Sequence, residues 1–135
     1  MPISNSPKHV DFDAEAAISA AREATDDRVL VGAEYTVDEY QILYARDDVL
    51  EEYGGQDGIE AVGDRLHAYM HVDFTERELY NDLYPHATDT RAFTTHTDYS
   101  TVVRVLDGTQ GLYVSLESGV AIAPLIDDLS AIIRD

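Results

Sequence analysis

The stretch STVVRVLDGTQGLYVSLESGVAIAPLIDDL, from Ser100 to Leu129, decides the fold class. Residues 100–107 are rich in β-branched side chains, and residues 112–117 alternate between apolar and polar, as a half-buried strand does. The loop DGTQG joins the two segments and has a glycine near each end. From Ile122 onward, apolar side chains recur every three or four positions, which predicts an amphipathic helix. The stretch therefore predicts two strands followed by a helix.

Working back toward the N-terminus, RAFTTHT, residues 91–97, predicts one more strand. Two helical segments precede it. Residues 59–71 place apolar side chains on one helical face, and residues 75–85 predict a second, shorter helix. We expect this second helix to begin after Thr75, because Glu78 would complete a capping box with it. The apolar face of the first helix consists of Ile59, Val62, Leu66, Tyr69 and Met70.

The first third of the chain predicts a helix and a hairpin after a polar start. Residues 11–27 carry small apolar side chains at helical spacing, and residues 28–36 and 39–48 read as two antiparallel strands. Residues 1–10 are expected to be a flexible tail. The element order is then α-β-β-α-β-β-β-α, which predicts a single α+β domain over residues 11–135. Its sheet would be five-stranded, mostly antiparallel and flanked by helices.

Charge is the most unusual property of the composition. The chain carries 27 acidic and 9 basic residues, for a net charge of -18, and Lys8 is its single lysine. This pattern resembles cytoplasmic proteins of halophiles, because molar salt screens the self-repulsion of an acidic surface. Binding of cations or basic partners is the alternative. Nucleic-acid binding is disfavoured, since it needs a basic patch.

Absent features narrow the function further. There are no cysteines, which excludes disulfides, thiol catalysis and iron–sulfur clusters. No apolar run approaches the roughly 20 residues of a membrane span, and the first residues lack the apolar core of a signal peptide. We therefore expect a cytoplasmic protein with no membrane contact and no cofactor.

Two histidines in DRLHAYMHVD, residues 64–73, raise the question of a metal site. On a helix, Asp64, His67 and His71 would share one face, and such a set can chelate an ion. The zinc-protease motif is incomplete, because Ala68 stands where it requires glutamate. A solvent-exposed polar face explains the same residues, and we predict that face, with the metal site as the alternative.

A hydroxyl, an imidazole and a carboxylate occur close together at Thr94, His96 and Asp98. Nothing in the sequence orients them as nucleophile and base, and the chain contains no nucleophile elbow or glycine-rich phosphate loop. We therefore predict no catalytic residue, and an enzyme is the least favoured class.

Tyrosine is over-used, with nine residues against no tryptophan and three phenylalanines. Tyrosine rings suit half-buried strand positions, and they also suit contact surfaces, where tyrosine and arginine are common anchors. In the hairpin, Tyr40, Tyr44 and Arg46 are expected to share one face. Packing at the edge of the core remains the alternative for these residues. The predicted contact residues are Tyr35, Tyr40, Tyr44, Arg46, Tyr69 and Phe93.

Two resemblances add to these expectations. The element order, and above all residues 100–129, resembles the roadblock/LC7 fold, a profilin-like sandwich with a five-stranded sheet. That likeness implies a non-catalytic regulatory module, often dimeric through the segments that correspond here to residues 59–71 and 91–97. YTVDEYQILYARDDV, Tyr35 to Val49, is similar to small uncharacterised haloarchaeal proteins, a likeness that covers most of the chain from Val29 onward and implies no activity.

The sequence thus predicts a non-catalytic regulatory or adaptor protein that acts through protein–protein contacts, as a homodimer. The alternative is a sensor of a small ligand or metal that uses the helix face of His67 and His71. Neither prediction names a partner.

Overall fold

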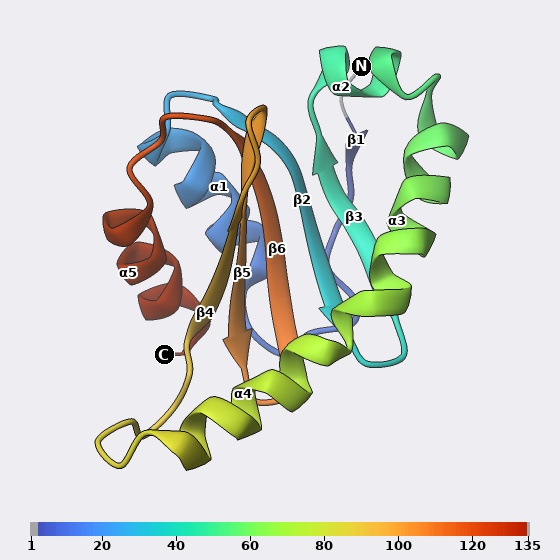
Figure 1. The fold of residues 1–135 in the computed structure, drawn as a ribbon. Coiled ribbons are helices and arrows are strands. Elements are labelled where there is room, and N and C mark those ends of the chain that lie inside the picture. The colour runs from blue at the N-terminus through green and yellow to red at the C-terminus, as the bar shows by residue number, and fades with distance from the viewer. Residues whose placement is uncertain (1–2, 135) are drawn as a thin grey trace.

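A six-stranded antiparallel sheet is the central layer of the computed structural model, which describes residues 3–134 (Figure 1). Its strands lie in the order β1 (Ile3–Ser4), β3 (Tyr40–Ala45), β2 (Val29–Thr36), β6 (Gln110–Glu117), β5 (Ser100–Asp107) and β4 (Ala92–His96). The predicted class, an α+β domain with an antiparallel sheet flanked by helices, is confirmed. The sheet has one strand more than predicted, because Ile3 and Ser4 pair with the end of β3.

Helices cover the two faces of the sheet unequally (Figure 1). One face packs against α1 (Ala14–Ala24) and α5 (Ile122–Ile133). The opposite face packs against α2 (Asp47–Glu52), α3 (Gln56–Met70) and α4 (Val72–Leu83). We call these the α1–α5 face and the α3–α4 face.

The α1–α5 face carries the main hydrophobic core. As predicted, the apolar positions of β6 and of the C-terminal helix point into it. Small residues let α1 approach the sheet closely. At Gly32 of β2, a Cβ atom would overlap the Cδ1 atom of Ile18. The fully buried members of this core include Ala14, Ala17, Ala21, Leu112, Val114, Leu116 and Leu129.

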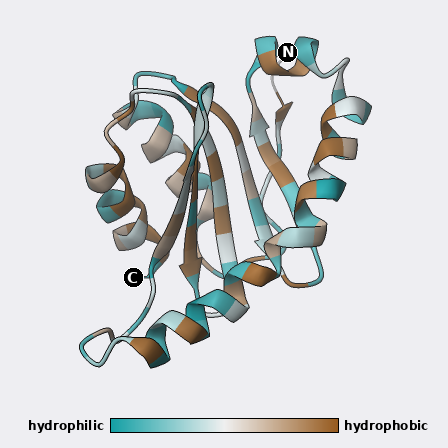
Figure 2. Cartoon of the chain, in the orientation of Figure 1, coloured by the Kyte–Doolittle hydropathy of each residue, from teal (hydrophilic) through white to brown (hydrophobic). Residues whose placement is uncertain are grey.

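The α3–α4 face is covered only in part. Of the predicted apolar face of α3, Ile59 and Met70 are buried. Val62, Leu66 and Tyr69 remain 40%, 38% and 75% exposed. Figure 2 shows hydrophobic segments along both α3 and α4. The predicted helix is therefore confirmed, but the sheet covers only part of the apolar face of α3.

A bulge in β3 separates two tyrosines that the sequence places on one face. Gly32 is opposite Tyr44, whereas the next residue of β2 is opposite Ile42, which leaves Leu43 without a partner on β2. The extra residue reverses the alternation of side chains. Tyr44 therefore packs in the α1–α5 core, while Tyr40 packs on the α3–α4 face.

The helix predicted to begin after Thr75, at Glu76, begins four residues earlier, at Val72. Asp73 and Phe74 are both buried against the sheet, so the chain is already helical where they are held. Thr75 lies inside the first turn and does not cap it. The burial of Asp73 and Phe74 therefore sets the start of α4, and the capping box predicted at Thr75 does not.

The expected flexible tail, residues 1–10, also differs from the structure. Residues 1 and 2 lie outside the described part, but β1 pairs with β3, and the Asn5 side-chain amide donates to the Ile42 carbonyl at 2.8 Å. Backbone N–H groups of residues 8–10 donate to the carboxylate of Glu34, which is fully buried. A buried acceptor thus holds the N-terminal segment against the sheet.

The loop between α4 and β4 is held by one carboxylate, that of Asp89. It accepts hydrogen bonds from Asn81 of α4, at 3.0 Å, and from Arg134 beyond α5, and it forms an ion pair with Arg77 at 2.9 Å. Burial acts to raise the pKa of Asp89, but the hydrogen bonds from Arg134 and Asn81 outweigh it, with help from the charge of Arg77. The pKa is therefore lowered.

Replacement of Asp89 by asparagine is expected to make the free energy of unfolding depend less on pH in the acid range. A carboxyl whose folded pKa is depressed stabilises the fold above its unfolded pKa of about 3.9 and loses that contribution as pH falls through the folded value. Urea unfolding of both proteins between pH 7 and pH 2 measures the difference. The two curves should lie apart at neutral pH and converge below about pH 4; parallel curves would contradict the assignment.

Candidate functional site

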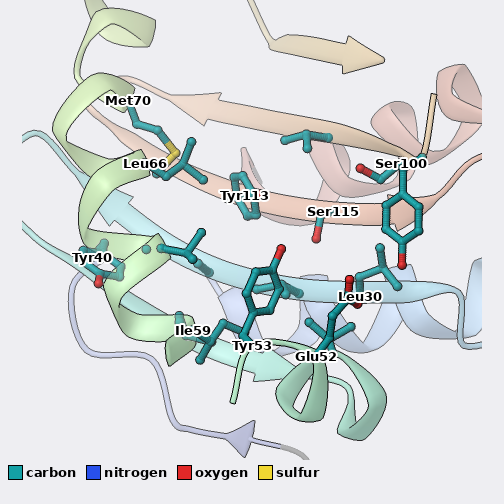
Figure 3. Close-up of a pocket in the computed structure, with 18 residues that line it drawn as sticks. Leu30, Tyr40, Glu52, Tyr53, Ile59, Leu66, Met70, Ser100, Tyr113 and Ser115 are labelled. Carbon is teal, nitrogen blue, oxygen red and sulfur yellow. The ribbon is translucent and has the colours of Figure 1, made fainter. Parts of the chain in front are cut away.

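A cavity of ≈ 150 Å³ lies between the α3–α4 face of the sheet and the helices α2 and α3 (Figure 3). Its walls come from β2, β3, β5 and β6 together with both helices, so segments far apart in sequence meet there. It exists because α3 covers only part of this face and leaves some of its own apolar side chains exposed. The apolar part of the lining includes Leu30, Ile42, Val49, Ile59, Leu66 and Val102.

The polar part of the lining is made almost entirely of hydroxyl groups. Tyr53, at the end of α2, and Ser115, on β6, direct their hydroxyls into the cavity (Figure 3). Tyr113 lies beside them on the sheet. Burial is the main cause of a raised pKa for Tyr113, a hydrogen bond from Ser115 opposes it, and the Tyr53 phenol adds to it. The two phenols and the serine hydroxyl are therefore close enough to influence one another.

One charged side chain lines this cavity, the carboxylate of Glu52. Within residues 3–134, every lysine, arginine and histidine lies outside the lining. The opening is bordered by exposed side chains, since Tyr53 and Tyr99 are 44% and 65% exposed. The cavity is thus an apolar hollow with an acidic, aromatic mouth.

Tyr40 forms one wall and fixes the position of α3. Its hydroxyl lies 2.5 Å from Oδ1 of Asp64, to which it donates. Burial and this hydrogen bond together raise the pKa of Tyr40 well above its ordinary value. Gly63 allows the close approach, because a Cβ there would lie 2.9 Å from the tyrosine ring. The Tyr40 ring also lies 5.1 Å from the His67 ring, centroid to centroid.

Two of the three candidate metal ligands, Asp64 and His67, instead hold α3 against the β2–β3 hairpin. Asp64 accepts from Tyr40, and Nε2 of His67 lies 2.9 Å from the Thr36 carbonyl oxygen, while His71 is exposed at the junction of α3 and α4. No group of three His, Cys, Asp or Glu side chains in residues 3–134 is arranged to hold a metal ion. His67 is half-buried, so the predicted solvent-exposed face is also corrected at that position.

A buried polar cluster joins α4 to the sheet. Asp73, 6% exposed, accepts on Oδ2 from the Tyr35 hydroxyl and from Nε of Arg104, each at 2.8 Å. Burial, followed by the charge of Asp73, raises the pKa of Tyr35 well above 10. Arg104 also donates to Oγ1 of Thr95 at 3.0 Å. Every group is used internally, so the cluster is a structural clamp.

The predicted contact residues fall into four environments. Tyr35 and Tyr44 are 0% and 6% exposed, which corrects the expectation that they face a partner; Tyr40 is engaged by α3. Arg46 is held by Asp48 and Glu117, at 2.7 Å each, and their hydrogen bonds raise its pKa. The remaining two, Tyr69 and Phe93, lie on or beside the exposed side of α3 and α4.

The hydroxyl, imidazole and carboxylate near β4 are not brought together as a triad. Nδ1 of His96 lies 3.4 Å from Oγ1 of Thr101, on the neighbouring strand, and Asp98 is in the following turn. Thr101 is buried and serves the pairing of β4 with β5.

Fold and site together define a small α+β domain with a cavity over one face of an antiparallel sheet. A family model described as a domain of unknown function, DUF7522, matches residues 15–134, and the chain belongs to this family. No curated protein and no solved structure matches the chain. Among residues 3–134, no helix is long and apolar enough to span a membrane. The roadblock/LC7 and haloarchaeal resemblances remain predictions.

Proposed function

We propose that the protein is a non-catalytic regulatory or adaptor module that acts through protein–protein contacts, first of all with a second copy of itself. The observation that supports this proposal is an exposed apolar surface on α4 and the end of α3. We call it the α4 surface. Its side chains, between 39% and 75% exposed, are Tyr69, Val72, Leu79, Tyr80, Leu83 and Tyr84.

Aromatic rings give the α4 surface a fixed shape. The rings of Tyr80 and Tyr84 are stacked with centroids 6.0 Å apart, and the Phe93 ring of β4 lies 6.0 Å from Tyr80. These residues border a shallow hollow between α4 and β4. Tyrosine-rich surfaces of this kind are typical of binding interfaces. An apolar patch on an otherwise strongly acidic protein is also the place where association costs least in charge repulsion.

A second copy is the favoured partner because β4 is the last strand of the sheet. It pairs with β5 along one side, and in the described part of the chain its other edge meets no strand. An edge strand beside an apolar patch can pair with its own copy about a twofold axis, which buries both at once. The acidic, lysine-poor composition supports a salt-rich cytoplasm as the setting, where charge repulsion between copies is screened.

Replacement of Leu79 by glutamate is expected to convert a dimer into a monomer. Leu79 is 51% exposed in the middle of α4, so the change should leave the fold intact and bury a charge only when two copies meet. Light scattering in multimolar KCl measures the mass. Val37→Glu is the matched control, because Val37 is 47% exposed in the distant β2–β3 turn, and this variant should remain dimeric. A monomeric wild-type protein would overturn the homodimer.

A further inference from the structure

We propose that the cavity between α2, α3 and the sheet binds a small organic cation with an apolar body, such as an ammonium group that carries an aryl or short alkyl substituent. The inference is independent of the proposed dimer, since none of the six side chains of the α4 surface lines the cavity.

The size and lining of the cavity call for an apolar body. Its volume of ≈ 150 Å³ equals that of an engineered apolar cavity in another protein that binds benzene. Ile59, Leu66 and Met70 approach from α3, and Leu30 comes from β2 of the sheet (Figure 3). Such walls offer contact to rings and short alkyl groups, and few hydrogen bonds to a polar molecule.

The charges around the cavity favour a cation. Glu52 is the charged group of the lining, and the lining includes four tyrosines, at positions 40, 53, 99 and 113. The face of an aromatic ring attracts cations, and ammonium groups are commonly bound among several such rings. Arg104, near Tyr113, does not cancel this preference, because it is paired with Asp73 at 2.8 Å.

Anions are disfavoured by the same arrangement. A fatty acid, a phosphate or a nucleotide would need a basic side chain in the lining, and residues 3–134 place none there. The net charge of -18 repels anions from the whole surface and concentrates cations near it. The whole-protein field and the local groups therefore select the same sign of charge.

The mouth of the cavity suggests how the ligand is oriented. Glu52, Tyr53 and Tyr99 are all exposed, which places the carboxylate and two rings at the entrance. The buried apolar side chains lie deeper, toward the sheet. The ammonium group would therefore remain at the entrance, close to water, with the apolar body inserted. This orientation avoids the cost of burying a charge completely.

The test uses phenyltrimethylammonium as the probe and the full chain labelled at its methyl groups. Titration followed by NMR should show saturable shifts at Leu30, Ile59 and Leu66. The affinity for the probe should be at least about fivefold higher than the affinity for tert-butylbenzene, its neutral isostere. A ratio of this size is in the range of one cation–π contact. Benzoate should not bind. Equal affinity for the neutral isostere, tighter binding of benzoate, or shifts confined to the outer surface would each overturn the proposal.

Two neighbouring glutamates separate a specific site from general attraction to an acidic protein. Glu52→Gln should weaken binding of the probe by up to about fivefold, because it removes the exposed charge at the entrance, and should leave binding of tert-butylbenzene unchanged. Glu51→Gln removes the same charge one residue away, outside the cavity lining, and should have no effect. Tyr53→Leu should weaken the cation more than the neutral isostere. Equal effects of the two glutamate variants would show that the attraction is diffuse and would overturn the site.

Discussion

Replacement of Arg104 by methionine is expected to destabilise the fold by about 3–5 kcal/mol, the usual cost of removing one member of a buried ion pair. The side chains of Arg104 and Asp73 are only 18% and 8% exposed, and their atoms lie 2.8 Å apart. Methionine preserves much of the aliphatic contact of arginine, so the loss is mainly electrostatic. Among residues 3–134, Asp73 would keep only the Tyr35 hydroxyl as a side-chain hydrogen-bond partner. Urea unfolding at pH 7 in molar KCl measures the change.

The double variant Arg104→Met, Asp73→Leu is the informative control. It removes both charges at once, so part of the lost stability should return, although the buried Tyr35 hydroxyl then loses its acceptor. Tyr35→Phe alone should cost about 1–2 kcal/mol, since it removes one hydrogen bond and leaves the ion pair. A loss below about 1 kcal/mol for Arg104→Met would mean that the pair behaves as an exposed one, contrary to its burial.

The clamp also shows which parts of the fold local sequence patterns could predict. The alternation in residues 112–117 and the helical spacing after Ile122 are local properties, and the structure follows both. Asp73 gave no such signal, because an acidic residue near the start of a helix ordinarily faces water. Its partners are distant in sequence, on β2 and β5. A buried polar residue of this kind is recognisable only after the strands are placed.

Strand bulges limited the prediction in a different way. The alternation rule assumes regular pairing, but β3 gains an unpaired residue, Leu43, between the partners of Gly32 and Ala33, and β2 is irregular between Val29 and Val31. Each irregularity moves the side chains beyond it to the other face. Tyr44 is therefore a core residue on the α1–α5 face, although its spacing of four from Tyr40 predicts that both lie on the same face. Bulges depend on the pairing of two strands, so the pattern of one strand does not reveal them.

The cavity was missed because its residues come from six elements. The apolar spacing of α3 was predicted, and it is equally consistent with a helix that is fully covered. What leaves Leu66 partly exposed is the placement of α3, which Tyr40, Gly63 and Asp64 set together. The available signal was the acidic–aromatic pair Glu52 and Tyr53 next to a run of glycines, which does not by itself indicate a cavity.

Replacement of Glu34 by glutamine is expected to cost about 3 kcal/mol, although the two side chains have nearly the same shape. Glu34 is 0% exposed, and both of its oxygens accept hydrogen bonds. Oε1 accepts from the backbone N–H of His9 at 2.7 Å and of Val10 at 3.1 Å. Oε2 accepts from the N–H of Lys8 at 2.9 Å and from the Gln41 amide at 3.0 Å. Either orientation of a glutamine amide would direct an N–H group at another donor.

Because the lost contacts are local, the loss of stability should begin in the N-terminal segment. Amide hydrogen exchange of Lys8, His9 and Val10 should accelerate well before global unfolding, whereas the centre of the sheet, at Val114, should exchange only at the global rate. Glu51→Gln makes the same chemical change at an exposed position. It should alter the free energy of unfolding by no more than about 0.5 kcal/mol and leave amide exchange at residues 8–10 unchanged. Unchanged exchange at residues 8–10 would show that the segment is held by β1 instead. If exchange there accelerates, Glu34 is the group that converts a polar N-terminal stretch into part of the folded domain.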